Sequence, residues 1–211
     1  MPHEQKPDYL SDNSMINENA ICLPLKFLPS TYWFASAAGK SELHISTNEF
    51  YRKENHPNRY NLLSANGVID LGVPLAGGRN QKILLTELKI AGDEWKRKHL
   101  HAIQSCYGKA PYFLYYFDEL ENCIHQSDDN FFALSISLIR WLSSVLLPGV
   151  TVNISEEANA VSPAEVYIEN KYHQVFENKF GFQKNMCAVD LLFCLGPDAK
   201  NYLARTKFSI E

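Results

Sequence analysis

The stretch that decides the fold is residues 95–113, which read WKRKHLHAIQSCYGKAPYF. Its apolar and aromatic residues recur at the spacing of one helical face, at Trp95, His99, Ala102, Ile103 and Cys106. Before this stretch the apolar residues come in short runs separated by turn residues. The sequence therefore changes from strands to helices near Asp93, which suits the N-cap of the first long helix.

Short apolar runs in the first half predict strands at residues 21–27, 42–46, 59–64 and 68–73, with a short helix at 31–38 and a further apolar segment at 84–90. Asn66-Gly67 lies between two of these runs and favours positive φ at both turn positions, which is typical of a tight hairpin. This half is predicted to be mostly antiparallel β-structure.

Helical patterns dominate after residue 93, with predicted helices at 93–107, 111–120, 131–147, 188–195 and 197–204 and one returning strand at 150–154. The expected fold class is α+β, with a mostly antiparallel β N-terminal half packed against a helical C-terminal half. A chain of 211 residues with 45% apolar content can bury one core, so residues 21–211 are predicted to form a single domain. The polar residues 1–20 are predicted to be a disordered tail.

Composition restricts the classes of function. The formal net charge is −4, and residues 1–20 supply −3 of it, so the domain itself is nearly neutral and unlike a nucleic-acid binder. The longest apolar stretch, 131–147, contains Arg140 and four serines, so no membrane span is predicted. Five cysteines without CxxC spacing fit reduced thiols in a core, and the absence of a leader-like start favours a cytoplasmic protein.

Two residues are candidates for catalysis. His99 lies on the apolar stripe of its helix, where it is either a core histidine with a satisfied ring nitrogen or a base in a shielded pocket. Asp190 lies within the apolar run AVDLLF and needs a partner, because burying an unpaired carboxylate is costly. It either caps a helix, pairs with a cation or acts on a ligand.

Six further residues are candidates for binding a substrate. They are polar or aromatic residues near strand mouths, helix ends and aromatic runs: Asn58, Arg59, Tyr107, Lys109, Tyr172 and Gln174. Instead of binding a substrate, these residues could form a turn, a surface ion pair, core packing or a solvated helix end. No GxSxG, HExxH, phosphate-loop or GxGxxG motif is present, and we predict neither a metal site nor a cofactor.

Several short blocks of this sequence carry a shared pattern of polar and aromatic residues: Asn58-Arg59, Ala65-Asn66-Gly67, Trp95, His99, Tyr107, Ala110-Pro111-Tyr112-Phe113, Tyr172-His173-Gln174-Val175-Phe176, Gly181-Phe182, Asp190-Leu191-Leu192-Phe193 and Gly196-Pro197. Together these blocks resemble those of the WbqC-like proteins of bacteria. The resemblance covers residues 21–203. It implies a cytoplasmic role in the assembly of cell-surface polysaccharide of the O-antigen type. A small-molecule substrate such as a nucleotide sugar follows from that role.

Two functions remain open from the sequence. The first is a transferase that moves an acyl or aminoacyl group to or from an activated sugar, with His99 as general base and Asp190 orienting it or the ligand. The second is a noncatalytic binding or assembly protein of the same pathway. The second is favoured by a departure from the family pattern, because residues 21–29 read ICLPLKFLP and lack the His-Gln pair that many WbqC-like proteins carry there.

Overall fold

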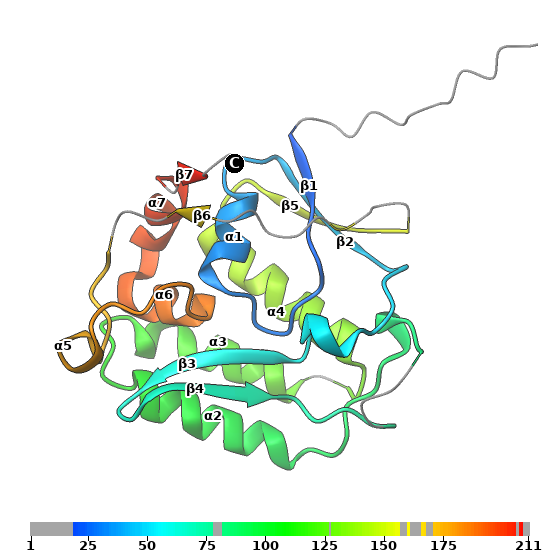
Figure 1. The fold of residues 1–211 in the computed structure, drawn as a ribbon, viewed down its shortest axis with the longest axis horizontal. Coiled ribbons are helices and arrows are strands. Elements are labelled where there is room, and N and C mark those ends of the chain that lie inside the picture. The colour runs from blue at the N-terminus through cyan, green and yellow to red at the C-terminus, as the bar shows by residue number, and fades with distance from the viewer. Residues whose placement is uncertain are drawn as a thin grey trace, which may run out of the picture.

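The computed structural model describes residues 19–77, 82–126, 128–156, 160, 166–167, 171–205 and 207–208. Figure 1 shows a small sheet at one end of the molecule and a β-hairpin at the other, with helices packed between and behind them. The sheet has the strand order β1-β2-β5 and consists of β1 (Ala20–Cys22), β2 (Glu42–Ser46) and β5 (Thr151–Ser155). Of the predicted tail, only residues 19 and 20 lie in the described part, where Ala20 begins β1.

The predicted fold class, α+β with mainly antiparallel strands, is wrong. The fold is mixed α/β, because β2 pairs in parallel with both β1 and β5. Helix α1 (Thr31–Ala37) lies between β1 and β2 and returns the chain to the edge from which it started, so the two strands run in the same direction. The described antiparallel pairs are the hairpin of β3 (Arg59–Ser64) and β4 (Gly67–Gly72) and the short pair of β6 (Val166–Tyr167) and β7 (Lys207–Phe208).

The predicted hairpin is confirmed, but its turn differs in detail. Ser64 pairs with Gly67, so the connecting residues are Ala65 and Asn66. Gly67 takes a φ of +102°, whereas Asn66 does not adopt a positive φ. The glycine thus supplies the left-handed backbone that the turn requires, and it does so at the first position of β4.

Five helices lie close to the predicted positions, and their bounds are α2 (Glu94–Tyr107), α3 (Phe113–His125), α4 (Phe131–Leu146), α6 (Ala188–Leu195) and α7 (Ala199–Ala204). The short helix α5 (Glu177–Phe180) was not predicted. Helix α4 begins where the Asn130 side chain accepts a 2.8 Å hydrogen bond from the Ala133 amide, which satisfies one free donor of the first turn. The apolar segment 84–90 is mostly irregular, with a short 3-10 helix at Leu85–Glu87.

Phe27 ties the separate elements into one core. Its ring lies 5.6 Å from that of Tyr60 on β3, 5.7 Å from Trp95 on α2 and 6.3 Å from Phe131 on α4. Phe27 itself is fully buried and follows β1 in the chain. Burial of an aromatic side chain of this size contributes about 2 kcal/mol, so this contact holds the hairpin and the two helices to the N-terminal segment.

The C-terminal helices approach α3 closely at Gly196. This glycine has a φ of +54°, and a Cβ atom placed on it would lie only 2.4 Å from the Tyr112 ring. Tyr112 precedes α3, and its backbone amide donates a 3.0 Å hydrogen bond to the Phe193 carbonyl on α6. The chain can turn from α6 into α7 at this point only without a side chain.

The five cysteines are free thiols, of which Cys106, Cys187 and Cys194 are buried. That burial agrees with the predicted core role of the thiols. Across the described ranges, none of the helices has both the length and the apolar character needed to cross a bilayer.

Candidate functional site

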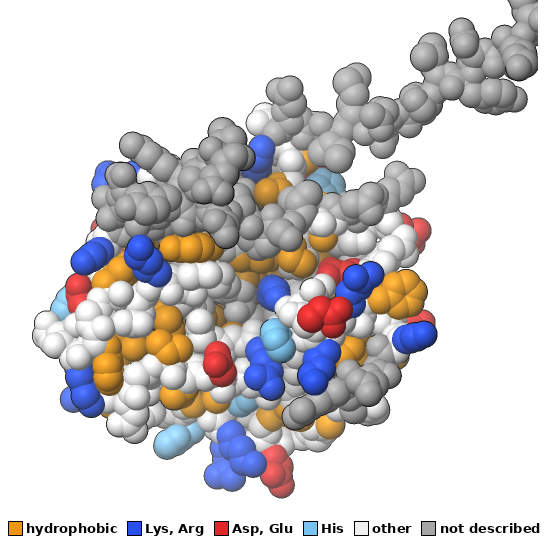
Figure 2. All heavy atoms as spheres, viewed as in Figure 1, with side chains coloured by type: hydrophobic (Ala, Val, Ile, Leu, Met, Phe, Trp, Pro, Cys, Tyr) orange, Lys and Arg blue, Asp and Glu red, His pale blue; other side chains and the backbone are white. Residues whose placement is uncertain are grey.

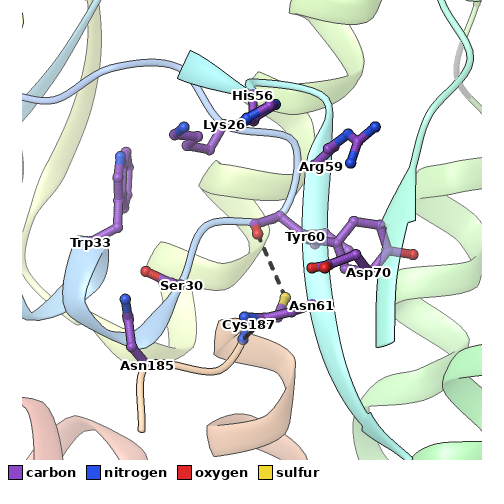
Figure 3. Close-up of a pocket in the computed structure, with 11 residues that line it drawn as sticks. Lys26, Ser30, Trp33, His56, Arg59, Tyr60, Asn61, Asp70, Asn185 and Cys187 are labelled. Atoms are coloured by element: carbon purple, nitrogen blue, oxygen red, sulfur yellow. Dashed lines mark hydrogen bonds between the residues drawn. The ribbon is translucent and has the colours of Figure 1, made fainter. Parts of the chain in front are cut away.

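A polar cavity of about 370 Å³ opens beside the start of the hairpin. Figure 3 shows its lining side chains, which come from the segment before α1, from β3 and β4, and from the loop before α6. We call it the basic cavity and define it by Lys26, Ser30, Trp33, His56, Arg59, Asn61, Asp70, Asn185 and Cys187, together with Leu28 and Tyr60.

Three nitrogen-bearing side chains, Lys26, His56 and Arg59, lie on one side of the basic cavity (Figure 3). On the surface, Lys, Arg and His side chains lie together with Asp and Glu side chains near the middle of the face that Figure 2 presents. Arg59 is exposed and forms no ion pair with the residues that the structure describes. Its guanidinium is therefore available for an anionic ligand, which it can bind through two parallel hydrogen bonds.

Lys26 is the most enclosed of the three. Its ammonium group donates a hydrogen bond to the Asn55 carbonyl. Burial lowers the pKa of Lys26, and the nearby Glu49 carboxylate opposes part of that shift. A bound anion would act on this pKa in the same direction as Glu49, so the ammonium gains favourable contacts when the cavity is filled.

The backbone of the basic cavity is strained at two places. In the described part of the chain, His56 (φ 43°) and Asn185 (φ 54°) are the residues other than glycine with a positive φ, and both line this cavity. Such conformations cost on the order of 1 kcal/mol and persist only where the surroundings enforce them. Residues with strained backbone conformations are concentrated at ligand-binding sites, so their position here supports a ligand-binding role for this cavity.

Hydrogen bonds between segments far apart in the sequence hold the lining of the basic cavity in place. The Asn61 side chain on β3 accepts a 2.8 Å hydrogen bond from the Cys187 amide, and the Asn185 side chain accepts a 3.0 Å bond from the Tyr32 amide. The Thr31 hydroxyl donates a 3.0 Å bond to the Met186 carbonyl. The loop before α6 is thereby fastened both to the hairpin and to α1, which leaves the cavity preformed.

A second cavity, of about 600 Å³, lies between β4 and the start of α2. We call it the His99 cavity and define it by Asp70, Leu71, Gly72, Pro74, Ala91, Gly92, Glu94, Trp95, Lys98 and His99. Nδ1 of His99 is 3.0 Å from the Tyr60 hydroxyl, and burial lowers the pKa of His99 to about 4. The imidazole is therefore neutral at physiological pH, and one ring nitrogen remains without a bond to Tyr60.

Asn58 and Arg59 border a third cavity, of about 340 Å³, which they share with His56. The Asn58 amide group donates a 2.7 Å hydrogen bond to the Val73 carbonyl and so closes the open end of the hairpin. Arg59 lines both this cavity and the basic cavity. Asn58 holds the backbone beside the cavities, and the Arg59 side chain lines both of them.

The predicted residue Asp190 lies in the core, with 0% of its surface exposed. Its Oδ1 accepts a 2.5 Å hydrogen bond from the Tyr172 hydroxyl and a 2.9 Å bond from the Gln174 amide group. Burial raises the pKa of Asp190, and hydrogen bonds from these two side chains lower it in part. Oδ2 has no hydrogen-bond partner among the described residues, which also favours the protonated acid.

Tyr107 belongs to the same buried group. Its hydroxyl accepts a 3.1 Å hydrogen bond from the Leu63 amide on β3, and its ring is 5.7 Å from that of Phe193. The hydroxyl proton is free to interact with Asp190, and this interaction lowers the pKa of the carboxyl group. Tyr107 thus links the hairpin, α2 and α6 inside the core.

The structure distributes the predicted site residues over three places. Asp190, Tyr107, Tyr172 and Gln174 meet in the core and line none of the cavities described here. His99 lines its own cavity, and Asn58 and Arg59 border the others. Lys109 is exposed after α2, apart from all of them.

Of the residues that line the basic cavity, Arg59 was predicted as a ligand contact, and Lys26, His56, Asp70 and Asn185 are among those that were not. A usable signal existed for His56, because His56-Pro57-Asn58-Arg59 directly precedes a strand and polar residues at strand mouths often contact ligands. Lys26 lies within an apolar run and gave no such signal.

No group of three or more His, Cys, Asp or Glu side chains within the described ranges could hold a metal ion.

The fold and the cavities define a mixed α/β protein with a preformed polar cavity that gathers basic side chains. Residues 26–166 match the WbqC-like protein family, and the chain belongs to that family. No curated protein and no solved structure gives a significant match. The matched range contains Lys26, His56, Arg59 and Asp70 of the basic cavity and ends before Asn185.

Proposed function

We propose that the protein binds an anionic metabolite, such as a nucleotide sugar, in the basic cavity, and that it acts in the assembly of cell-surface polysaccharide. One observation carries the proposal: Lys26, His56 and Arg59 converge on a preformed cavity whose backbone is strained at His56 and Asn185. Phosphate groups are the anions that such a set of ammonium, imidazole and guanidinium groups binds best. Membership of the WbqC-like family supports the pathway that we propose.

The proposed reaction is transfer of an acyl or aminoacyl group from a thioester to an amine or hydroxyl of the sugar. The sugar nucleophile forms a bond to the acyl carbon, the carbon–sulfur bond breaks, and the departing thiolate becomes a thiol. His99 is the base that we propose for the nucleophile's proton, because its imidazole is neutral and lines a cavity next to the basic one. Asp190 lines no described cavity, so we assign it no step in this reaction, and its hydrogen bonds hold Tyr172 and Gln174 in place.

A noncatalytic binding protein of the same pathway is the second candidate. It is favoured because Asp190 lines none of these cavities, whereas a carboxylate that orients His99 would have to contact the imidazole. The described partner of His99 is instead Tyr60. A hydroxyl partner leaves the imidazole a weaker base than a carboxylate partner would.

Thermal denaturation with and without UDP-N-acetylglucosamine tests the anion site, because a ligand that binds only the native state raises the midpoint of unfolding. We expect a dose-dependent rise for the wild type and for Arg97→Ala, which removes an exposed cation outside the cavities. The rise should be lost in Arg59→Ala. An equal rise in both variants would overturn the assignment of the basic cavity.

Mass spectrometry then separates the two candidate functions. The protein is incubated with UDP-N-acetylglucosamine and either acetyl-coenzyme A or an aminoacyl thioester, and the sugar is examined for the added acyl mass. Product that forms with the wild type and is lost in His99→Gln supports the transferase. Tight binding of the sugar with no product from either donor supports the binding protein.

A further inference from the structure

We propose that the His99 cavity is a second ligand site, built for an uncharged saccharide, and that its ligand lies next to the anion in the basic cavity. The saccharide site itself rests on the residues that line it. Only the pairing of two ligands rests on the proposed function. The proposal goes beyond that function by adding a neutral saccharide to the anionic ligand of the basic cavity.

The charges in the His99 cavity nearly cancel. Glu94 lies 3.6 Å from Lys98, so these two groups form a surface ion pair and leave Asp70 as the remaining charge. His99 is neutral, because burial lowers its pKa to about 4. An anionic ligand would find no unpaired cation here, in contrast to the basic cavity.

The hydrogen-bonding groups favour hydroxyls. Asp70 offers carboxylate oxygens, and His99 offers the ring nitrogen that is not bonded to Tyr60. The indole N–H of Trp95, a side chain that lines this cavity and is 5% exposed, is buried and has no partner among the described residues. A hydroxyl group both donates to a carboxylate and accepts from an indole, so a polyhydroxylated ligand satisfies all three groups. Leu71, Pro74 and Ala91 supply apolar surface for the C–H faces of a sugar ring.

Both cavities are lined in part by residues of the hairpin. Arg59 and Asn61 alternate with Tyr60 along β3, so they project to the side of the basic cavity while the Tyr60 hydroxyl reaches His99. Asp70 pairs with Asn61 across the hairpin and lines both cavities. Ligands in the two cavities would therefore approach one another at Asp70.

The three tryptophans of the chain give a reporter for each cavity. Trp33 lines the basic cavity and Trp95 lines the His99 cavity. Trp141 donates its indole N–H to Glu119 at 2.6 Å and lines neither cavity. Nuclear magnetic resonance of ¹⁵N-labelled protein resolves one indole signal per tryptophan, so ligand binding can be assigned to a cavity directly.

The test is a titration with methyl glycosides of glucose and N-acetylglucosamine, each to about 50 mM because a lone sugar ring binds with a Kd near the millimolar range. We expect the Trp95 signal to shift and saturate while the Trp141 signal stays in place. Unshifted Trp95 at the highest concentration, or equal shifts of all three signals, would overturn the saccharide site. A separate titration with inorganic pyrophosphate should shift the Trp33 signal.

Blocking variants add a matched control. Ala91 is exposed at the rim of the His99 cavity, so Ala91→Phe should fill the cavity without disturbing the core and weaken glycoside binding at least roughly tenfold. Ala133→Phe introduces the same side chain at an exposed position of α4 and should have no effect. Pyrophosphate that fails to bind while glycosides still shift Trp95 would reject the proposed function and leave the saccharide site standing. The opposite result would reject the saccharide site alone.

Discussion

The Tyr172 hydroxyl donates a 2.5 Å hydrogen bond to Oδ1 of Asp190, and both residues are almost completely buried. This bond joins the segment after β6 to helix α6. Gln174 strengthens the junction, because its side chain bonds Asp190 and also both backbone groups of Gln183. The carboxyl group that resembled a catalytic residue in the sequence therefore stabilises the C-terminal part of the fold.

Replacing Tyr172 by Phe tests this structural role. The variant leaves Asp190 with one fewer donor in a buried site, so we expect the free energy of unfolding to fall by about 1–3 kcal/mol in chemical denaturation. Tyr115→Phe removes a hydroxyl from a side chain that is 74% exposed and should change stability little. Anion binding should be the same in both variants, since neither side chain lines the basic cavity.

Asp190→Asn should change the dependence of stability on pH. Burial raises the pKa of Asp190 in the folded protein, so its stabilising contribution is complete below the pKa of the unfolded chain and declines as the pH rises through the folded value. Asn does not titrate. The stability difference between wild type and Asp190→Asn should therefore shrink as the pH is raised, and a difference that grows with pH would contradict a raised pKa.

The contribution of His99 to stability should depend on pH in the opposite direction. Its pKa is lowered from 6.5 to about 4 in the folded protein, so its contribution is complete above about pH 6.5 and is lost as the pH falls toward 4. The loss amounts to about 3 kcal/mol at most. His99→Gln keeps a polar group beside Tyr60 but removes the titration, and its unfolding free energy should fall less steeply over this pH range in denaturant titrations.

Two substitutions at His56 separate backbone strain from ligand contact. His56 adopts a φ of 43°, which Gly tolerates and Ala does not. We expect His56→Gly to be about 1 kcal/mol more stable than His56→Ala, and both to bind UDP-N-acetylglucosamine more weakly than wild type. Equal stability of the two variants would show that the left-handed backbone carries no strain, and unchanged binding would remove the imidazole from the site.

Gly196→Ala should destabilise the packing of the last two helices. The new methyl group would lie 2.4 Å from the Tyr112 ring in a backbone of positive φ. We expect a loss of about 1–3 kcal/mol, which thermal unfolding can measure. Gly149→Ala is a suitable control, because that glycine also has a positive φ but a Cβ atom there would meet no neighbour within 4 Å. The difference between the two variants isolates the contact with Tyr112.

Much of the secondary structure follows from local sequence patterns. The strands Glu42–Ser46 and Arg59–Ser64 and the helix Ala188–Leu195 have the predicted bounds, because each is a short apolar run with clear breakers on both sides. Strand direction could not be obtained in this way. Thr151–Ser155 pairs with a strand from the other half of the chain, and nothing in its own residues specifies that partner.

The candidate site was harder to predict because the basic cavity collects residues from four separate segments. Lys26, His56, Asp70 and Asn185 lie far apart in the sequence, and each alone resembles an ordinary surface or loop residue. Asp190 misled for the opposite reason, since a carboxylate in an apolar run suggests either chemistry or a buried partner. Only the three-dimensional structure reveals that Tyr172 and Gln174 supply those partners.

The position of β5 beside β2 has a consequence for the way the chain acquires its structure. About a hundred residues separate Ser46 at the end of β2 from Thr151 at the start of β5, so the loop that their pairing closes contains about half of the protein. Contacts over such separations form slowly. During synthesis, the edge of β2 that pairs with β5 keeps free backbone N–H and C=O groups until residue 155 has emerged. Such an exposed edge promotes aggregation between neighbouring nascent chains.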